Sequence, residues 1–297
     1  MREVFGLADS ENLRRKLEIM TEENFWKECL QTASRKWNLT ELTCVYNKEN
    51  GGVYQANSVE FGPVILKVHR NRDSLSREFR ALTEMQGEAC CQVYAFDTVN
   101  GLLLEERILP GTVLKQESDW GRRAASFVQV FETIHNVPKN ADSYHSYLDW
   151  VRDACQTVSD QENRELSEGM HHAVAIAEEM FGKYPERMLL HGDLHHENML
   201  KNETGNYCII DPKGVVGPSV FDIPRFVLNE LDYPDDSLRK VHIDGVIETL
   251  SRLLKYPAAD LYLLLFMEIM LENAWSFGDR GEVVDRDMRF AREIVER

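Results

Sequence analysis

The chain lacks any apolar run long enough to cross a membrane as a helix. Its most apolar stretch, residues 261–271, is interrupted by Glu268 and falls short of the ~20 residues that a bilayer requires. The first residues also lack the apolar stretch of about 7 to 15 residues that is typical of a secretory signal. We therefore expect no membrane span and a cytoplasmic protein.

Cysteines are few, and none is followed by another at Cys-x-x-Cys spacing, the pattern of many redox and zinc sites. With 297 residues, 43% of them hydrophobic, the chain can bury enough apolar surface for two lobes and does not need disulfides as staples. The simplest interpretation is free thiols in a reducing compartment, at positions 29, 44, 90, 91, 155 and 208.

Positive charge is also scarce, with 34 basic residues against 50 acidic ones and a net charge of -16. A nucleic-acid partner is not expected, because affinity for a phosphate backbone needs clusters of lysine and arginine. The excess lies mainly after residue 105, where 34 acidic residues accompany 21 basic ones. This acidic half would attract a cationic small molecule, and general solubility is the alternative explanation.

The most informative segment spans residues 190–200 and continues to an apolar pair before Asp211. It places Asp193, then Asn198 five positions later, then Asp211 thirteen positions after that. Phosphoryl transfer needs a carboxylate that aligns a hydroxyl, together with oxygen ligands for Mg²⁺ ions that neutralise the phosphate. The segment therefore predicts a phosphotransfer site.

The protein-kinase pattern His-Arg-Asp-x-x-x-x-Asn has the same spacing, with His191-Gly192-Asp193 in place of its first three residues. The segment resembles the Brenner motif of aminoglycoside phosphotransferases and their kinase-like relatives. Within that group, residues 211–214 and 221–226 are most similar to the streptomycin phosphotransferase and hydroxyurea kinase branch.

This resemblance implies an α+β, two-lobe, protein-kinase-like fold. A small antiparallel sheet with one inserted helix would form the N-lobe, and a larger, mostly helical C-lobe would follow. The resemblance also implies that ATP is the phosphoryl donor, that Asp193 is the catalytic base, and that Asn198 and Asp211 hold Mg²⁺. It is strongest over residues 187–228 and extends to residues 63–111.

The element order before residue 105 fits such an N-lobe. Alternating apolar residues and turn signals predict a hairpin around a polar turn at Gly51-Gly52, and one helix follows the third strand. The expected elements are two helices within 9–37, strands at 42–46, 53–59 and 63–68, a helix at 74–86, and strands at 93–96 and 102–105.

After a linker at residues 106–117, the pattern becomes helical to the end of the chain. We therefore expect a nucleotide-binding lobe at 1–105 and a helical lobe at 118–297 that carries the catalytic loop and the acceptor site. Short strands are expected only around the motif, between helices near 119–136, 142–159, 164–183, 222–231, 237–255 and 258–276.

Lys67 lies in an apolar strand, where a lone charge requires a partner, and Glu78 in the following helix can supply one. In kinase-like folds such a lysine contacts the α- and β-phosphates of ATP. A solvent-facing lysine with an unrelated glutamate is the alternative.

Gly51 and Gly52 are candidates for the lid over ATP, because the backbone N–H groups of residues without a Cβ can approach phosphate closely. Since Gly-x-Gly-x-x-Gly is absent, an ordinary hairpin turn is the competing interpretation.

The segment from Glu105 to a Pro-Gly break at 110–111 is where the linker should lie. By resemblance, the carbonyl of Glu106 and the N–H of Ile108 would bind adenine. Glu105 departs from the family pattern, in which the residue beside the adenine pocket is usually apolar.

Three histidines flank Asp193 and could suggest zinc, but no fourth ligand stands at a typical spacing. We interpret His191 as a structural residue that hydrogen-bonds the loop backbone.

Lys213 would help to neutralise the transferred phosphate, or would form a surface salt bridge. Asp222 stands at a good N-cap position, and by resemblance it braces the catalytic loop.

The C-terminal helix offers acceptor-binding candidates at a helical spacing of four, three and four: Glu268, Glu272, Trp275 and Asp279. Carboxylates and an aromatic ring on one helical face could hold a cationic or polyhydroxyl ligand. A solvated helix face is the alternative.

These features predict an ATP-dependent kinase acting on a small-molecule hydroxyl, of the aminoglycoside (streptomycin-type) or hydroxyurea-type resistance class. A protein substrate is disfavoured, because the chain lacks Ala-Pro-Glu and Asp222 follows Pro212 after ten positions, which leaves little room for an activation loop. The alternatives are a metabolic kinase for a sugar, amino alcohol or fructosamine-type compound, and an inactive nucleotide-binding regulatory protein. The sequence does not indicate an oligomeric state.

Overall fold

The computed structural model describes residues 22–48, 50–85, 87, 89–159, 163–231 and 236–295. The chain divides into two compact units. Unit 1 comprises the described residues up to Phe79 together with Gln92–Arg107, and unit 2 comprises Arg80–Cys91 and the described residues from Ile108 onward. The sequence predicted one division after residue 105, whereas residues 80–91 group with unit 2. The first helix predicted within residues 9–37 lies outside the described residues.

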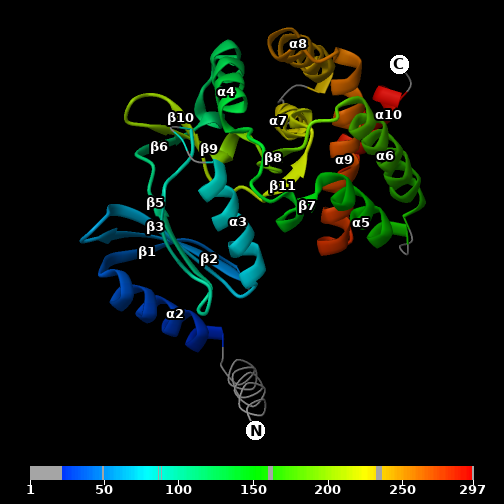
Figure 1. Cartoon of the computed structure of the whole chain (residues 1–297). Helices are drawn as coiled ribbons and strands as arrows, with labels where there is room; N and C mark the ends of the chain where they lie inside the picture. The colour runs from blue at the N-terminus through cyan, green and yellow to red at the C-terminus, as the bar shows by residue number, and fades with distance from the viewer. Residues whose placement is uncertain are drawn as a thin grey trace. The chain divides into compact units, whose positions relative to one another are not determined.

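Unit 1 is built on a five-stranded antiparallel sheet in the order β1-β2-β3-β5-β4. Figure 1 labels β1, β2, β3 and β5 of this sheet. The predicted strands are confirmed with slightly longer bounds: β1 Leu39–Lys48, β2 Gly51–Ser58, β3 Gly62–His69, β4 Val93–Asp97 and β5 Leu102–Glu106. The helix α2 (Glu22–Trp37) buries Trp26, Cys29 and Ala33 in one hydrophobic cluster with apolar residues of β2, β3 and β5.

The two glycines that were predicted to form the turn of the β1–β2 hairpin belong to strand β2. Gly51 pairs with Lys48 and Gly52 pairs with Asn47, so both glycines begin β2 rather than form the turn. A Cβ at Gly51 would lie 2.6 Å from the ring of His69, and a Cβ at Gly52 would lie 2.8 Å from the ring of Tyr54. Close side-chain packing therefore accounts for glycine at these strand positions.

Unit 2 is mainly helical, and its core is a single large apolar cluster. The long helix α9 packs against α5, α6 and α7 (Figure 1), and Phe127 of α4 stacks on Phe226 of α7 with ring centroids 4.1 Å apart. The helices are α4 Trp120–Ile134, α5 Tyr147–Ser159, α6 Arg164–Lys183, α7 Ile223–Glu230, α8 Asp236–Leu254, α9 Ala258–Arg280 and α10 Asp285–Val295. The helix α3 (Arg72–Met85) begins in unit 1 and ends in unit 2.

Two small sheets hold the segments around the motif. One has the order β10-β9-β6 and the other the order β7-β11-β8. Their strands are β6 Pro110–Val113, β7 His145–Ser146, β8 Met188–Leu190, β9 Met199–Asn202, β10 Tyr207–Ile209 and β11 Val215–Gly217. Both sheets carry the motif segments, because β8, β9, β10 and β11 flank the loops that bear the predicted site residues.

Three expectations about the helical half were wrong. The helix predicted from residue 142 begins at Tyr147, because residues 145–146 pair with β11 instead. Short strands after residue 118 are not confined to the motif, since β7 lies between α4 and α5 and pairs with β11. No helix was predicted after residue 276, yet α10 follows α9 and contributes Met288, Phe290 and Ile294 to the core.

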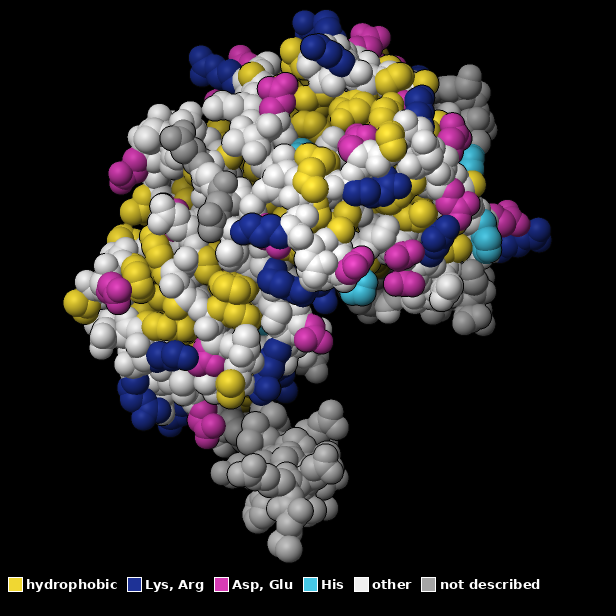
Figure 2. Space-filling view, viewed as in Figure 1, with side chains coloured by type: hydrophobic (Ala, Val, Ile, Leu, Met, Phe, Trp, Pro, Cys, Tyr) yellow, Lys and Arg dark blue, Asp and Glu magenta, His cyan; other side chains and the backbone are white. Residues whose placement is uncertain are grey.

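Within the described ranges, none of the helices is both long and apolar enough to cross a membrane. On the face seen in Figure 2, positive and negative side chains are interspersed among apolar and uncharged ones. The acidic excess of the second half therefore does not form one continuous patch on that face.

The Phe127–Phe226 stack supports α7, which carries site residues described below. Replacing the fully buried Phe127 by Ala should lower the free energy of unfolding by about 3–5 kcal/mol, because it removes apolar burial and leaves a cavity. Urea unfolding followed by fluorescence and circular dichroism measures the change. The exposed Val137→Ala is the control and should stay within about 0.5 kcal/mol; equal effects in both variants would contradict the proposed packing role.

Candidate active site

The loop that carries Asp193 is held by the carboxylate of Asp222. The backbone N–H of His191 donates to Oδ2 of Asp222 at 2.8 Å, and that of Gly192 donates to Oδ1 at 2.7 Å. Nε2 of His135 lies 2.8 Å from Oδ2. Although Asp222 precedes α7, its side chain makes no cap hydrogen bond to that helix. The capping interpretation was wrong, and the carboxylate contacts the loop instead.

His191 connects the loop to the segment after β10. Its buried ring places Nε2 2.9 Å from the carbonyl oxygen of Ile210, and its carbonyl oxygen accepts the N–H of Lys213 at 2.7 Å. Nδ1 accepts the N–H of Asp193 at 3.2 Å. Burial lowers the pKa of this imidazole, so the neutral ring can serve as acceptor at Nδ1 and donor at Nε2. These contacts hold the two halves of the motif together.

Gly192 occupies a conformation that few other residues tolerate. Its φ is +77°, and a Cβ there would lie 2.9 Å from a methyl group of Val215 and 3.5 Å from the ring of Trp150. Glycine therefore lets the chain turn sharply just before Asp193.

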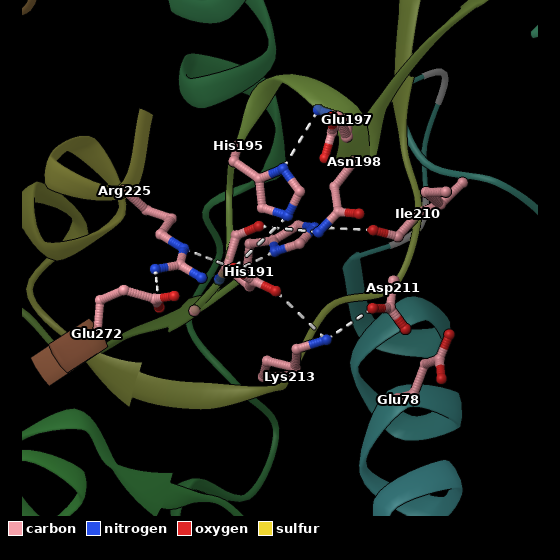
Figure 3. Close-up of polar contacts among 12 residues, drawn as sticks. Glu78, His191, His195, Glu197, Asn198, Ile210, Asp211, Lys213, Arg225 and Glu272 are labelled. Carbon is pink, nitrogen blue, oxygen red and sulfur yellow. Dashed lines mark hydrogen bonds and ion pairs between the residues drawn. The ribbon is translucent and has the colours of Figure 1, made fainter. Parts of the chain in front are cut away.

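Asp193 lies among three positively charged or chargeable side chains, those of Arg225, Lys213 and His195, which are labelled in Figure 3. Oδ1 accepts Nε–H of Arg225 at 2.8 Å, Oδ2 lies 3.4 Å from Nζ of Lys213, and Nε2 of His195 is 3.7 Å from Oδ1. Burial alone would raise the pKa of Asp193, but the charges of Arg225 and Lys213 outweigh it and lower the pKa. The carboxylate is therefore ionised at neutral pH and can accept a hydrogen bond from a hydroxyl.

Asn198 and Asp211 are the predicted ligands of a divalent cation. Nδ2 of Asn198 donates to the carbonyl oxygen of Asp193 at 3.0 Å, so its amide oxygen is the atom left to serve as a ligand. Asp211 has a positive φ of 60° and a side chain that is 41% exposed. Oδ2 of Asp211 lies 2.6 Å from the ammonium of Lys213, a positive charge standing against the carboxylate. A carboxylate and an amide oxygen are hard donors that suit Mg²⁺, so these residues fit the ion.

Arg225 is the site residue that the sequence prediction missed. It lies on α7, and its Nη1 is 2.6 Å from Oε2 of Glu272 and 3.3 Å from Oε1 of Glu268, both on α9. It thus links three carboxylates, counting Asp193. The available signal was its position three residues after Asp222, on the same helical face as a residue already tied to the loop.

The predicted acceptor residues on α9 have different environments. Glu268 is buried, accepts the hydroxyl of Tyr147 at 2.8 Å and has its pKa raised by burial to about 7. A solvated helix face is therefore wrong for this residue. The side chain of Glu272 is 33% exposed. Trp275 packs edge-on against Trp150, with ring centroids 5.4 Å apart. Of the predicted carboxylates whose side chains the structure describes on this helix, Glu272 is the one that a ligand could reach; the side chain of Asp279 lies outside the described residues.

The three histidines around Asp193 have three separate sets of partners. His191 binds the loop backbone, and the Nδ1 of His195 accepts the N–H of Glu197 at 3.2 Å. His196 is buried, stacks on Phe226 and lies 2.7 Å from Oε1 of Glu230. This arrangement holds the loop in place and does not gather the three rings around one ion.

In unit 1, Lys67 forms a buried ion pair with Glu78, and its Nζ lies 3.4 Å from Oε2 of Glu105. A solvent-facing lysine with an unrelated glutamate is therefore wrong. Glu105, which departs from the family pattern, is almost fully buried, and its Oε1 has no hydrogen-bond partner in the described part of the chain. The ammonium of Lys67 accounts for the choice of a carboxylate residue at this buried position.

Glu106 and Ile108 lie at and beyond the end of β5. Glu106 pairs with Val64 of β3, and its N–H donates to the carbonyl oxygen of Gln92 at 2.8 Å. Ile108 is buried at the start of the main segment of unit 2. Adenine binding by the backbone of these two residues, and phosphate binding by Gly51 and Gly52, stay predictions.

The antiparallel sheet of unit 1 and the helical unit 2, with a catalytic-type loop between short strands, define a protein-kinase-like fold of the phosphotransferase type. Residues 36–277 match the family described as aminoglycoside/hydroxyurea antibiotic resistance kinase. Because this match covers most of the chain, the protein belongs to that family. The fold and family predicted from the motif are confirmed.

Two curated relatives are streptomycin kinases. The chain is 25% identical to streptomycin 6-kinase of Streptomyces griseus over 190 residues, which cover 59% of this chain and 61% of that protein. It is 26% identical to streptomycin 3''-kinase of Klebsiella pneumoniae over 171 residues, which cover 56% and 61%. The similarity thus spans less than two thirds of these relatives' length.

Solved structures with the same fold share little sequence with the chain. Choline kinase LicA from Streptococcus pneumoniae superposes with a TM-score of 0.65 at 13% identity, covering 91% of this chain and 97% of that one. Aminoglycoside phosphotransferase APH(4)-Ia gives a TM-score of 0.64 at 12% identity, covering 91% and 97%. The fold is therefore shared by proteins named for quite different acceptors.

Gly192→Ala tests the tight turn before Asp193. The variant should be destabilised by about 1–3 kcal/mol, because alanine is strained at positive φ and its methyl group would meet Val215. Chemical unfolding measures the change. Gly182→Ala on α6 is the matched control, since a Cβ there has no neighbour within 4 Å and alanine favours a helix. A loss of stability in Gly182→Ala that matches Gly192→Ala would contradict this account.

Glu230 should make stability depend on pH in acid. Burial raises its pKa, but hydrogen bonds from His196 and Arg123 outweigh burial and hold the pKa at about 2, against 4.5 for an ordinary Glu. Its stabilising contribution is therefore complete above pH 4.5 and is lost as the pH falls towards 2. The difference in unfolding free energy between wild type and Glu230→Gln should be large at pH 7 and shrink below pH 4.5.

The control for this measurement is Glu203→Gln on the exposed turn between β9 and β10. It should change stability little at any pH. A stability difference for Glu230→Gln that stays constant from pH 7 to pH 3 would show that the carboxylate charge is not what holds this cluster.

Proposed function

We propose that the protein is an ATP-dependent phosphotransferase that moves the γ-phosphoryl group to a hydroxyl of a small molecule. The observation that carries this proposal is the ionised Asp193 carboxylate, fixed beside Asn198 and Asp211 on a loop braced by Asp222. The family match over residues 36–277 supports the same chemistry.

In the proposed reaction, the acceptor hydroxyl donates a hydrogen bond to Asp193. The bond between the hydroxyl oxygen and the γ-phosphorus forms, the bond from that phosphorus to the bridging oxygen of ADP breaks, and the hydroxyl proton passes to Asp193. Because Arg225 and Lys213 lower the pKa of Asp193, the carboxylate is a weak base. It therefore aligns the hydroxyl first and takes the proton late.

The residues of each unit have separate tasks in this proposal. Asn198 and Asp211 would hold Mg²⁺, which when bound neutralises phosphate oxygens. Lys67, oriented by Glu78 and Glu105, would contact the α- and β-phosphates. Gly51 and Gly52 would approach the phosphates, and the backbone of Glu106 and Ile108 would bind adenine.

Two further residues are assigned to the phosphate and the acceptor. Lys213 would turn from Asp211 towards the transferred phosphate. For the acceptor, Glu272 offers a reachable carboxylate, Trp150 offers an aromatic ring beside Gly192, and Trp275 packs against Trp150. This combination suits a cationic or polyhydroxyl molecule.

Among acceptors, an aminoglycoside of the streptomycin type or a hydroxyurea-type compound is favoured, because two curated relatives are streptomycin kinases. An amino alcohol, sugar or fructosamine-type metabolite is the second candidate, since a choline kinase shares the fold. An inactive nucleotide-binding protein is disfavoured, because Lys67 and Asp193 both keep the ionic partners that an active site needs.

Asp193→Asn tests the proposed chemistry. Turnover should fall by about 10²- to 10⁴-fold, since the amide cannot accept the hydroxyl proton, while ATP affinity changes little. ADP release would be followed over streptomycin, other aminoglycosides, hydroxyurea, sugars and amino alcohols, and ATP binding by calorimetry. Asp142→Asn, at an exposed carboxylate, is the control and should leave turnover unchanged. Full turnover in Asp193→Asn would overturn the mechanism.

A further inference from the structure

The guanidinium of Arg225 uses different nitrogens for different carboxylates. Nε donates to Oδ1 of Asp193 at 2.8 Å, while Nη1 lies 2.6 Å from Glu272 and 3.3 Å from Glu268. The arginine side chain is only 17% exposed, and that of Asp193 is 16% exposed. Charge-assisted hydrogen bonds in such a partly buried setting are short, strong and directional. Arg225 is thus fixed from α9 by Glu272, as Figure 3 shows, and it in turn fixes Asp193.

This arrangement distinguishes the two oxygens of the Asp193 carboxylate. Oδ1 is committed to Arg225 at 2.8 Å, whereas the ion pair between Oδ2 and Nζ of Lys213 is longer, at 3.4 Å. An acceptor hydroxyl that approaches Asp193 therefore meets the weaker competing contact at Oδ2. Rotation of the carboxylate would exchange the two oxygens and break the bond to Arg225.

Arg225 also stands close to the group that holds the loop backbone. It follows Asp222 by three residues at the start of α7, and Asp222 accepts the N–H groups of His191 and Gly192. One end of one helix therefore holds the loop backbone through Asp222 and the reactive carboxylate through Arg225. A lysine could not reproduce this, because a single ammonium lacks the planar fork that reaches two sides at once.

We propose that Arg225 is the positioning residue of Asp193, which it holds so that Oδ2 receives the acceptor hydroxyl, and that Glu268 and Glu272 hold Arg225 in turn. This inference rests on the proposed phosphotransfer. It adds that the rate depends on a carboxylate–arginine chain running from α9 to Asp193. Arg225 contacts neither substrate in this proposal and acts through Asp193.

The experiment compares Arg225→Ala, Arg225→Lys and Glu272→Gln with wild type in the full-length protein, using the best acceptor from the ADP-release screen. Misplacement of a reacting group by about 1 Å costs about 10²-fold in rate. We expect Arg225→Ala to lower kcat by about that factor while KM for ATP changes less than about threefold. Arg225→Lys should recover only part of kcat, and guanidinium ions at millimolar concentration should restore activity to Arg225→Ala.

Glu272→Gln should lower kcat less than Arg225→Ala does, because Arg225 keeps its contacts with Glu268 and Asp193. Arg152→Ala is the matched control. Arg152 pairs with exposed carboxylates on α5 and α6, at 2.7 Å from Glu178, and its loss should leave kcat unchanged. Thermal unfolding of every variant separates loss of fold from loss of positioning.

Wild-type kcat in Arg225→Ala would overturn the inference. So would a loss of kcat that parallels a loss of thermal stability in both Arg225 variants and is not restored by guanidinium, because that pattern indicates a purely structural tie. If Arg225→Ala does not fold, the inference is tested by Arg225→Lys alone. A wild-type kcat in Arg225→Lys would then contradict the need for a planar guanidinium. If wild type phosphorylates none of the acceptors, the proposed function fails on its own, before any Arg225 variant is measured.

Discussion

The rest of the site depends on the hydrogen bonds that the buried carboxylate of Asp222 accepts from the loop. It accepts the N–H groups of His191 and Gly192, two backbone donors that would otherwise lie unpaired in the interior. Oδ2 also lies beside His135 of the segment after α4. Since a buried carboxylate needs several donors to offset its loss of water, the loop and the carboxylate stabilise each other. These contacts fix the backbone immediately before Asp193 and thereby the position of Asp193.

The sequence predicted those parts of the fold whose signal is local. The spacing of Asp193, Asn198 and Asp211 identified the loop, because the chemistry requires these residue types within a short segment. The helix at 164–183 was predicted with its observed bounds, because its apolar residues repeat with helical period. The strand β7 was missed, since a two-residue strand has no periodicity and depends on a distant partner, β11.

The parts of the site that escaped prediction depend on contacts between distant residues. Arg225 meets Glu268 and Glu272, which are 43 and 47 positions away in the sequence. Its one local signal, the spacing of three residues from Asp222, does not by itself separate it from a surface arginine. The departure of Glu105 from the family pattern likewise has no local explanation. It is explained by the pairing of β3 with β5, which places Lys67 beside Glu105. For Asp222 the local pattern allowed both a helix cap and a brace for the loop, and only the contacts with His191 and Gly192 distinguish the two, in favour of the brace.

Lys213 lies between Asp211 and Asp193, at 2.6 Å from one carboxylate and 3.4 Å from the other. Two carboxylates so close together would repel each other in the absence of a cation. The protein supplies that cation from its own chain, on the segment that links β10 to β11. The ammonium of Lys213 therefore offsets part of the repulsion between the two carboxylates. A cation that binds at Asp211 would therefore have to compete with Lys213 for the same carboxylate.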